Sequence, residues 1–479
     1  MAKKSKTNKV KPKVLKGFRD YPPEEEIARQ ILIQKTRTVF EKYGYLPLQT
    51  ASLEFAESLL GPHYTPDNLK ELFGFEGPEN VEMALRYEFT LSLARYVAGN
   101  PQMTLPFRRY QYGNVWRVDK PGPGRFREFM QFDFDIVGTA SMLADAEIIA
   151  VMSDVLDYLG IKNFIIRYSN RKLINGLVEF AGLPPEKAVD VFRVIDKLEK
   201  QGREAVLDEL GPGRIDQSGD KIPGLGLKDN QINLLNTFLN LYLLPKSEII
   251  TKTKDLLNHI KTSQEGISEL IEIQGYLNDM GVSDDKAQLD VTIVRGLGYY
   301  TGPVYETTLL DLPDYGSVFS GGRYDNLVNR FSGKKIAATG SSFGVDRMLA
   351  ALIALKAIEL KKSTADVVVT TMDKSHMADY IKIAGELRRA GFNTEIFHGE
   401  TKNINKQLKY ADRIGIPVAV IIGSDEFKAD QVTVKDLRAG LEKSKEVADR
   451  EKWLEAEGIQ KTIKRDELLS YISNLLNKD

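Results

Sequence analysis

The chain has 479 residues and an almost balanced charge, with 66 Lys and Arg against 67 Asp and Glu. The absence of cysteine excludes disulfides, thiol nucleophiles and cysteine-ligated metals, and it fits a reducing compartment such as the cytoplasm. Only four histidines occur, far apart in the sequence, so we expect no metal site built from cysteine or histidine. No apolar run approaches the roughly 20 residues of a membrane-spanning helix, so no membrane partner is expected.

Residues 1–16 form a basic tail with seven lysines and no acidic residue. The rest of the chain therefore carries a net charge of −8, although the whole chain carries only −1. The tail lacks the apolar segment of a secretory signal. We favour a disordered, solvated arm over the alternative, a segment attracted to RNA. Because charge is unevenly placed, the small net charge does not exclude a polyanionic partner.

The rest of the sequence divides by pattern into four regions. Residues 17–171 mix helical periodicity with strand-like runs, and 172–285 are mostly helical. Residues 286–360 return to strands and glycines and end in a helix-like run, Phe343–Leu360. After a short charged linker, residues 365–479 alternate buried-strand and helix patterns. This order predicts one domain of sheet and helices, interrupted by a helical insertion and followed by a small α/β domain.

A hairpin is expected where Phe107–Trp116 and Phe129–Val137 flank the turn-forming sequence 120–124. Since side chains alternate along a strand, the apolar residues of the second segment share one face. The other face combines arginines, acids, an amide and an aromatic ring: Arg117, Asp119, Arg125, Arg127, Phe129, Gln131, Asp133 and Asp135. A salt-bridged solvated face is the usual interpretation of such alternation. Here the amide, the ring and the inner acids favour a ligand face, because arginine forks bind phosphates and rings stack on bases.

Two later segments also carry candidate residues. The apolar run 291–294 reads as a strand that ends at Arg295, whose buried charge would need a partner. In the C-terminal domain, four basic residues step by four, three and four, which places them on one face of a helix: Lys402, Lys406, Lys409 and Arg413. An ordinary solvated face is the alternative to a phosphate-binding stripe.

The hairpin resembles motif 2 of the class II aminoacyl-tRNA synthetases, and six further segments resemble the histidyl-tRNA synthetase family. In chain order these segments are 16–25, 40–47 (motif 1), 85–90, 294–302 (the histidine-specific signature), 320–325 and 343–347 (motif 3). The resemblance implies an α+β class II catalytic domain, with an antiparallel sheet flanked by helices. It also implies a helical insertion and a C-terminal α/β anticodon-binding domain. One departure is Gly298, where the family usually has Asp.

The resemblance assigns five residues to ATP. Arg117 would hold the α-phosphate and Arg125 the γ-phosphate, while Asp119 would contact the adenine amino group. Phe129 would stack on adenine, and Arg347 would lie against adenine and the γ-phosphate. Arg117, Arg295 and Arg347 would be the catalytic residues, because they stabilise charge at the reacting centre.

The resemblance also implies a site for the histidine substrate. Its residues would be Glu88, Thr90, Arg117, Gln131, Asp135, Arg295, Tyr299 and Tyr300. Glu88 and Thr90 would hold the α-amino group, and Asp135 would accept a hydrogen bond from the imidazole ring. The alternatives are that Thr90 only caps a helix and that the tyrosines only pack in the core.

As a whole the resemblance implies a homodimeric, cytoplasmic histidine–tRNA ligase. It would use ATP with Mg²⁺ to form histidyl-adenylate and transfer the histidyl group to tRNA(His), whose anticodon arm the basic stripe would contact. One alternative is an inactive regulatory subunit of ATP phosphoribosyltransferase, since such paralogues resemble this catalytic domain but generally lack the anticodon-binding domain. Another is a different class II enzyme, such as a prolyl or threonyl synthetase.

Overall fold

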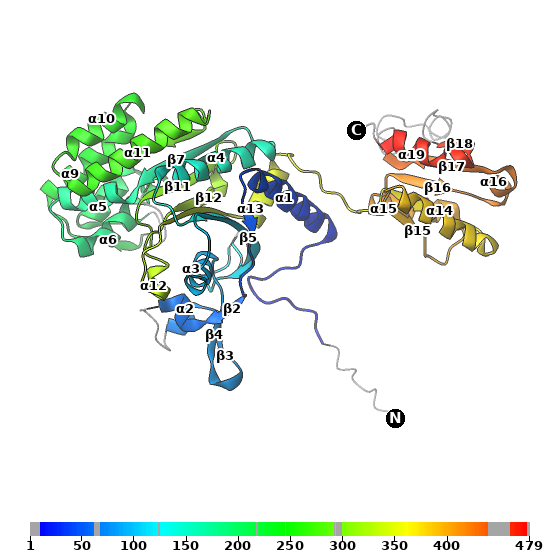
Figure 1. Cartoon of the computed structure of the whole chain (residues 1–479), viewed down its shortest axis with the longest axis horizontal. Helices are drawn as coiled ribbons and strands as arrows, with labels where there is room; N and C mark the ends of the chain where they lie inside the picture. Colours follow the sequence, from blue (N-terminus) through cyan, green and yellow to red (C-terminus); the bar gives the residue numbers. More distant parts are fainter. Residues whose placement is uncertain are drawn as a thin grey trace. The chain divides into compact units, whose positions relative to one another are not determined.

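The computed structural model describes residues 10–61, 68–122, 125–216, 219–244, 246–291, 293, 299–438 and 460–476. The chain forms two compact units, Met1–Asp20 with Ile31–Ile358, and Glu359–Asp479 with Tyr21–Gln30. Figure 1 shows the elements along the chain.

An eight-stranded sheet is the base of the first unit. Its strands are, in spatial order, β1 (Leu46–Pro47), β5 (Phe107–Trp116), β6 (Glu128–Val137), β13 (Ala338–Gly344), β12 (Ser317–Arg323), β11 (Pro303–Leu309), β7 (Phe164–Asn170) and β10 (Ala287–Leu289). All neighbours are antiparallel except the two edge pairs, β1 with β5 and β7 with β10. The expected mainly antiparallel sheet is thereby confirmed.

The predicted hairpin is formed by β5 and β6, in a register that pairs Phe107 with Val137 and Trp116 with Glu128. The even-numbered side chains of β6 form part of the core. Phe40 of α1 (Pro23–Lys42) packs on Phe132 and Phe134, with ring centroids 5.0 and 4.6 Å apart. The odd-numbered side chains of β6 therefore project from the opposite face, as the alternation predicted.

Short helices and a small sheet complete the part of the unit around β5 and β6. The helices are α2 (Ala56–Leu60), α3 (Thr90–Gly99), α4 (Met142–Tyr158), α12 (Asn329–Ser332) and α13 (Val345–Ala354). The small sheet has the order β2 (Leu53–Phe55), β4 (Glu82–Leu85), β3 (Gly74–Glu76), and it lies beside α2 at the lower edge of Figure 1.

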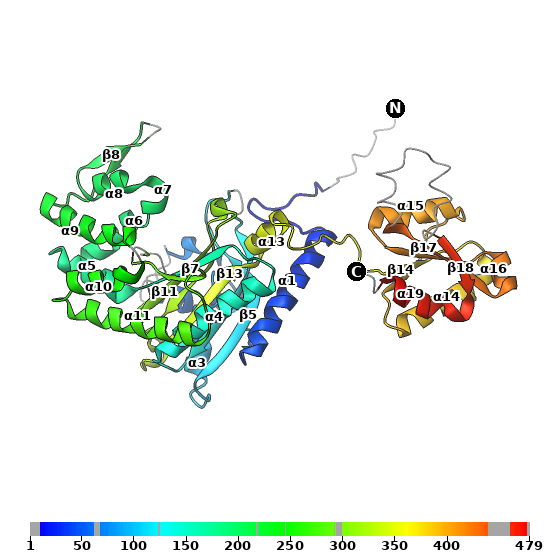
Figure 2. The ribbon, with the colours of Figure 1, turned by 90° about the horizontal axis from the view of Figure 1, so that it is seen from above.

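The region 171–279 is mostly helical, as its pattern predicted. It contains α5 (Arg171–Phe180), α6 (Ala188–Ile195), α7 (Leu198–Gln201), α8 (Arg203–Leu210), β8 (Gly213–Ile215), β9 (Lys221–Pro223), α9 (Asp229–Leu239), α10 (Lys246–Leu256) and α11 (Lys261–Asp279). Figure 2 shows these helices grouped on one side of the unit, with β8 extending from the group. Helix α11 packs on α5 and α4, which joins the group to the sheet.

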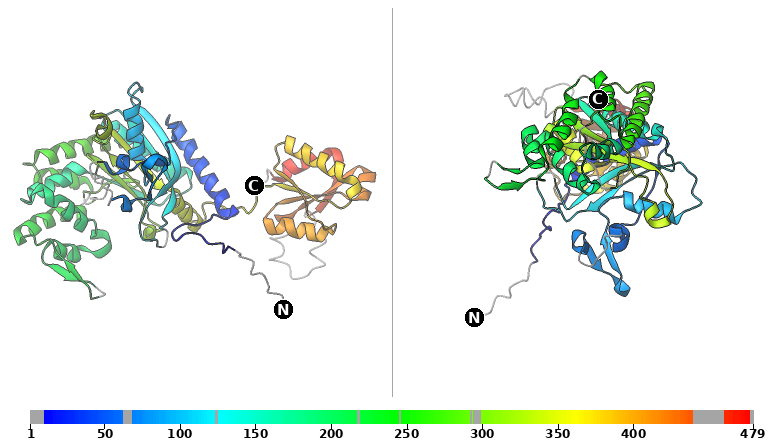
Figure 3. Two further views of the ribbon diagram at one scale, coloured as in Figure 1. Left: turned by 90° about the horizontal axis from the view of Figure 1, so that it is seen from below. Right: turned by 90° about the vertical axis from the view of Figure 1, so that its left-hand side faces the viewer.

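The second unit has a five-stranded sheet in the order β15 (Thr394–Ile396), β14 (Val367–Val369), β16 (Val418–Ile421), β17 (Gln431–Asp436), β18 (Gln460–Lys464). Helices α14 (Met377–Arg389) and α19 (Leu468–Leu476) cover one face, and α15 (Ile404–Ile414) covers the other, as Figure 3 shows. A short helix, α16 (Ser424–Ala429), precedes β17. The predicted α/β character of this region is confirmed.

Two expected elements differ from the structure or lie partly outside the described residues. The strand expected at 291–294 includes residues 292 and 294, which lie outside the described residues, whereas Val291 lies in a turn and a strand, β10, forms earlier. The helix expected from Phe343 begins at Val345, because Phe343 and Gly344 pair with Phe132 and Gln131 at the end of β13. No helix in the described part of the chain is long and apolar enough to cross a membrane.

Candidate active site

Glu88 is a buried carboxylate at the start of α3. It accepts hydrogen bonds from the backbone N–H groups of Thr90 and Leu91, at 3.1 and 2.7 Å, and from the Tyr299 hydroxyl at 3.2 Å. The helix is therefore capped by Glu88, and the expectation that Thr90 itself caps it was wrong. Because the helix start carries partial positive charge, it stabilises the ionised carboxylate. A fixed carboxylate of this kind suits an ammonium group.

Asp135 is buried on the odd-numbered face of β6. Its carboxylate lies 2.7 Å from the Arg109 guanidinium, which is fully buried, and accepts a hydrogen bond from the Tyr324 hydroxyl. Burial raises the pKa of Asp135, although the Arg109 charge and the Tyr324 hydrogen bond oppose the rise. Gly340 makes room for this carboxylate, because a Cβ there would lie 2.0 Å from Asp135 Oδ1.

Asp133 and Gln131 lie on the same face, one and two steps along β6 from Asp135. Gln131 Nε2 donates to Ser342 Oγ at 2.9 Å, and the Ser342 hydroxyl donates to Asp133. Burial raises the pKa of Asp133 to about 7. Ser342 lies on β13, directly opposite Asp133 in the register.

The two tyrosines of the resemblance lie beside these acids. The rings of Tyr299 and Tyr300 meet edge to face, 5.1 Å apart, and Tyr299 also contacts Tyr324 at 6.0 Å. The pKa of Tyr300 is raised mainly by burial, and the charges of Glu88, Asp135 and Asp133 raise it further. Tyr300 therefore lies within the field of Glu88 and Asp135, two acids assigned to histidine, and of Asp133.

Three arginines converge near the end of the hairpin. The pKa of Arg347 is lowered mainly by burial, and then by the nearby charges of Arg125 and Arg117. Arg347 Nη1 donates to the Ser317 carbonyl at 2.7 Å, and Arg117 Nε donates to the Tyr87 carbonyl at 3.1 Å. A partly buried cluster of like charges is costly in the free protein and suits a polyphosphate.

The remaining ATP residues occupy the hairpin and its loop. Phe129 lies on β6, and the Arg117 guanidinium stacks over its ring at 5.1 Å from the centroid. Asp119 and Arg125 are exposed in the loop, beyond the ends of the two strands. Alternation holds only within a strand, so it does not place these two side chains, nor those of Arg117 and Arg127, which also lie beyond the strand ends.

Arg295 and Gly298 lie outside the described residues, as do residues 1–9 of the basic tail. The glycines Gly321 and Gly322 are described, and protein atoms fill the space beside them. A Cβ on Gly321 would lie 2.2 Å from the Gly340 carbonyl oxygen, and one on Gly322 would lie 3.1 Å from the Tyr300 ring. Both glycines therefore allow protein atoms to pack closely against β12.

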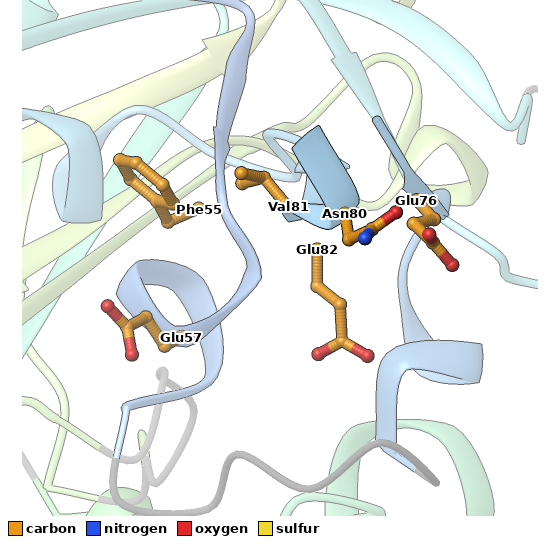
Figure 4. A pocket seen from close by; sticks show the side chains of 6 residues that line it. All are labelled: Phe55, Glu57, Glu76, Asn80, Val81 and Glu82. Atoms are coloured by element: carbon orange, nitrogen blue, oxygen red, sulfur yellow. The ribbon is translucent and has the colours of Figure 1, made fainter. Parts of the chain in front are cut away.

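A pocket on the small sheet is separate from this constellation (Figure 4). Its lining residues are Phe55, Glu57, Glu76, Asn80, Val81 and Glu82. Three carboxylates give it the wrong charge for phosphates. Within the described ranges, no group of three or more His, Asp or Glu side chains can hold a metal ion. The arginine cluster is therefore the better candidate site for an anion.

The basic residues of the C-terminal unit lie on or next to α15. The side chains of Lys402, Lys406, Lys409 and Arg413 are exposed, whereas Gln407 and Ala411 are buried against the sheet. The spacing argument therefore placed the four cations on the outer side of the helix. Whether they bind RNA stays a prediction.

Some site residues were missed by the sequence reasoning. Arg109 lies on β5 with odd parity, beside the predicted odd-numbered face of the hairpin, and this position within the strand was a usable signal. Tyr324, Ser342 and Arg323 carried no local signal of their partners. Arg323 makes its main ion pair with the buried Asp145, and its contact with Asp325 is longer, at 3.4 Å.

Known protein families and proteins resemble the chain along most of its length. The sequence matches the family model of histidyl-tRNA synthetase over residues 17–348 and an anticodon binding domain over residues 366–475. It is 42% identical to the histidine–tRNA ligase of Ruegeria sp. (strain TM1040), covering 99% of this chain and 98% of that one. It is 40% identical to the histidine–tRNA ligase of Paracoccus denitrificans, covering 99% and 100%.

A solved structure also resembles the whole chain. The crystal structure of histidyl-tRNA synthetase from Nostoc sp. PCC 7120 is 30% identical, with a TM-score of 0.81, and the match covers 98% of this chain and 100% of that one. The fold class expected from the motifs is thereby confirmed. The chain belongs to the histidyl-tRNA synthetase family.

Proposed function

We propose that the protein is a histidine–tRNA ligase, which activates histidine with ATP and transfers it to the 3′ end of tRNA(His). The observation that carries this proposal is the division of the site into two charged ends. Glu88, Asp133 and Asp135 are buried acids at one end, and Arg117 and Arg347 belong to the arginine cluster at the other. The first end suits the ammonium and imidazole N–H groups of histidine, and the second suits the phosphates of ATP.

In the proposed reaction a carboxylate oxygen of histidine attacks the α-phosphorus of ATP. The bond between the α-phosphorus and the bridging oxygen breaks, so that histidyl-adenylate and pyrophosphate form. A hydroxyl of the terminal ribose of tRNA then attacks the histidyl carbonyl, and AMP leaves. No nucleophilic side chain is needed, because positioning and charge stabilisation by the arginines supply the catalysis.

The roles of the single residues are part of the proposal. Arg117 and Arg125 would hold the phosphates, and Arg347 would neutralise charge that develops on the leaving pyrophosphate. Arg295, from the family's signature, would hold the histidine carboxylate. Mg²⁺ would arrive with ATP as a substrate complex, since Mg²⁺ commonly takes most of its ligands from substrate phosphates and water.

Four further proposals rest on the family. Residues 17–171 and 286–360 would form the catalytic domain, 172–285 the insertion and 365–479 the anticodon-binding domain. The protein would be a cytoplasmic homodimer, joined through motif 1, where Leu46 is 57% exposed on the edge strand β1. The regulatory-subunit alternative is not favoured, because the relatives that match the full chain are histidine–tRNA ligases.

The decisive test is amino-acid-dependent exchange of pyrophosphate into ATP. We expect exchange with histidine and none with proline or threonine, and purified tRNA(His) should then accept histidine. Exchange with no amino acid would contradict the enzyme proposal. A molar mass of one chain by light scattering would contradict the dimer.

The basic stripe has its own test. Lys406→Glu with Lys409→Glu should raise the KM for tRNA several-fold and leave histidine-dependent exchange unchanged, because both side chains are exposed on α15. The matched control is Lys382→Glu, which reverses an exposed charge on α14. Aminoacylation kinetics equal to those of the wild type would reject the stripe as an RNA contact.

A further inference from the structure

The Gln131 side chain is held in one orientation by its surroundings. Its Nε2 donates to Ser342 Oγ at 2.9 Å, so the amide nitrogen is engaged by the protein. Its Oε1 is buried and finds no hydrogen-bond partner among the described residues. A buried acceptor without a partner is costly, and ligand-binding sites are where such atoms are found. The free oxygen therefore points to a ligand that donates a hydrogen bond.

Asp133 determines which way the Ser342 hydroxyl points. A serine hydroxyl has one proton, and here it donates to the Asp133 carboxylate. The lone pairs of Ser342 Oγ are then left to accept from Gln131, which must present its NH₂ group to the serine. An amide turned the other way would place Oε1 against an oxygen that has no proton to offer. Three side chains thus form a relay with a single direction.

The positions of the relay residues in the sheet make the arrangement rigid. Gln131 and Asp133 are two residues apart on β6, and Ser342 is paired with Asp133 across the β6–β13 ladder. Asp133 is only 4% exposed, and its carboxylate also lies in the field of Arg109. Backbone pairing on both strands holds the three side chains on one face.

We propose that Asp133 and Ser342 are positioning residues that fix the Gln131 amide with its oxygen toward the histidine substrate. The inference rests on the proposed function, and it goes beyond the family residues by explaining how one of them is oriented. With the amide so fixed, Glu88, Gln131 and Asp135 all present acceptors. A site built from acceptors selects a ligand rich in N–H groups. It rejects a ligand without such groups, because the buried oxygens of the protein would then stay unpaired.

A purely structural polar pair between two strands is the competing explanation. It predicts that removing the Ser342 hydroxyl weakens the fold and affects both substrates alike. The relay predicts a selective effect on histidine, since only the orientation of the Gln131 amide is lost. The ratio of the two KM values therefore separates the explanations.

The experiment compares Ser342→Ala with Ser342→Thr in the full-length protein, by histidine-dependent ATP–pyrophosphate exchange. Ser342→Ala should raise the KM for histidine about tenfold, which is the usual effect of one hydrogen bond, and leave the KM for ATP within about twofold. Ser342→Thr keeps the hydroxyl and should restore the histidine KM. The matched control is Ser341→Ala, which removes the neighbouring hydroxyl, a donor to the Ser320 carbonyl at 3.2 Å.

Asp133→Asn is the second variant, and it tests the direction of the relay. Its amide can donate to Ser342, so the serine proton becomes free to meet Gln131 Oε1 and the orientation is lost. We expect a similar rise in the histidine KM, and no further rise when Asp133→Asn is combined with Ser342→Ala, because both break one pathway.

Three results would overturn the relay: an unchanged histidine KM in Ser342→Ala, equal rises in the two KM values, or no rescue by threonine. If Ser342→Ala does not fold, the KM values of Asp133→Asn decide by the same criteria. A wild-type protein without histidine-dependent exchange would overturn the proposed function and, with it, the relay. Normal wild-type exchange with an unaffected Ser342→Ala would reject the relay alone.

Discussion

Replacing Arg347 by glutamine should separate ligand binding from stability. Arg347 is a partly buried cation whose pKa is lowered by burial and by the charges of Arg125 and Arg117. Arg347 Nη1 donates a hydrogen bond to the Ser317 carbonyl, at 2.7 Å. The arginine is thus in an unfavourable electrostatic environment until an anion binds. Removing the Arg347 charge should weaken ATP binding but leave the stability of the ligand-free protein almost unchanged.

The expected loss of ATP affinity follows from one charge-assisted contact. A hydrogen bond to a charged group contributes about 1.5–3 kcal/mol, and 1.4 kcal/mol is a factor of ten, so the KM for ATP should rise about ten- to a hundredfold. The histidine KM should change much less. If Arg347 also stabilises charge in the transition state, kcat falls as well.

The expected change in stability is small. Loss of the bond to the Ser317 carbonyl costs about 1 kcal/mol, whereas relief of burial and of repulsion within the arginine cluster offsets it. We therefore expect the free energy of unfolding of the ligand-free variant to stay within about 1 kcal/mol of the wild type. An arginine with a structural role would instead leave an unpaired acceptor and a destabilised fold.

The assay is ATP–pyrophosphate exchange with varied ATP, together with urea unfolding in the absence of ligand. Arg193→Gln is the matched control, because Arg193 is exposed and pairs with Asp190 three residues away on α6. An ATP KM within twofold of the wild type would refute the role in ATP binding. A loss of several kcal/mol in the ligand-free protein would refute the electrostatic reasoning.

Three more changes test other parts of the structure. Arg323→Met should lower the free energy of unfolding by about 3–5 kcal/mol, because it leaves Asp145 charged and buried, and a loss below 1 kcal/mol in urea unfolding would contradict this. The pKa of Asp133 is raised from 3.8 to about 7. Between these pH values the folded state binds more protons than the unfolded state, so the free energy of unfolding falls as the pH rises. Asp133→Asn should remove this fall in the free energy of unfolding, which is at most about 4 kcal/mol across the window. Parallel curves of unfolding free energy against pH for variant and wild type would reject this prediction. Gly17→Ala should raise the ATP KM several-fold, because Gly17 has φ +88° and a Cβ there would lie 2.8 Å from Arg127 Cγ on the hairpin. An unchanged ATP KM would show that the loop adapts.

Local pattern was sufficient for the hairpin. The strand β5 occupies the predicted residues, and β6 begins one residue before the predicted start, at Glu128. Alternation then placed Gln131 and Asp135 on one face, because period-two patterning depends only on the strand itself. The same rule said nothing valid about Asp119, which lies past the end of its strand.

Partners that are distant in the sequence could not be predicted in this way. Asp145 and Arg323 are 178 residues apart, and their ion pair depends on how α4 packs against β12. The pairing of Ser342 with Asp133 depends on the register between β13 and β6. Register and packing are properties of the assembled sheet, so single-segment patterns contain little information about them.

The two ends of the site carry opposite unbalanced charge, and this has a consequence for binding. Among the described residues, Glu88, Asp133 and Asp135 are buried near one buried arginine, Arg109, so these side chains carry more negative than positive charge at the end assigned to histidine. The arginine cluster leaves positive charge at the end assigned to ATP. Each substrate therefore neutralises an end that costs free energy in the free protein. Both histidine and ATP should raise the midpoint of thermal unfolding when added singly, and histidinol, which lacks the carboxylate, should still do so because the acidic end recognises the ammonium and the ring.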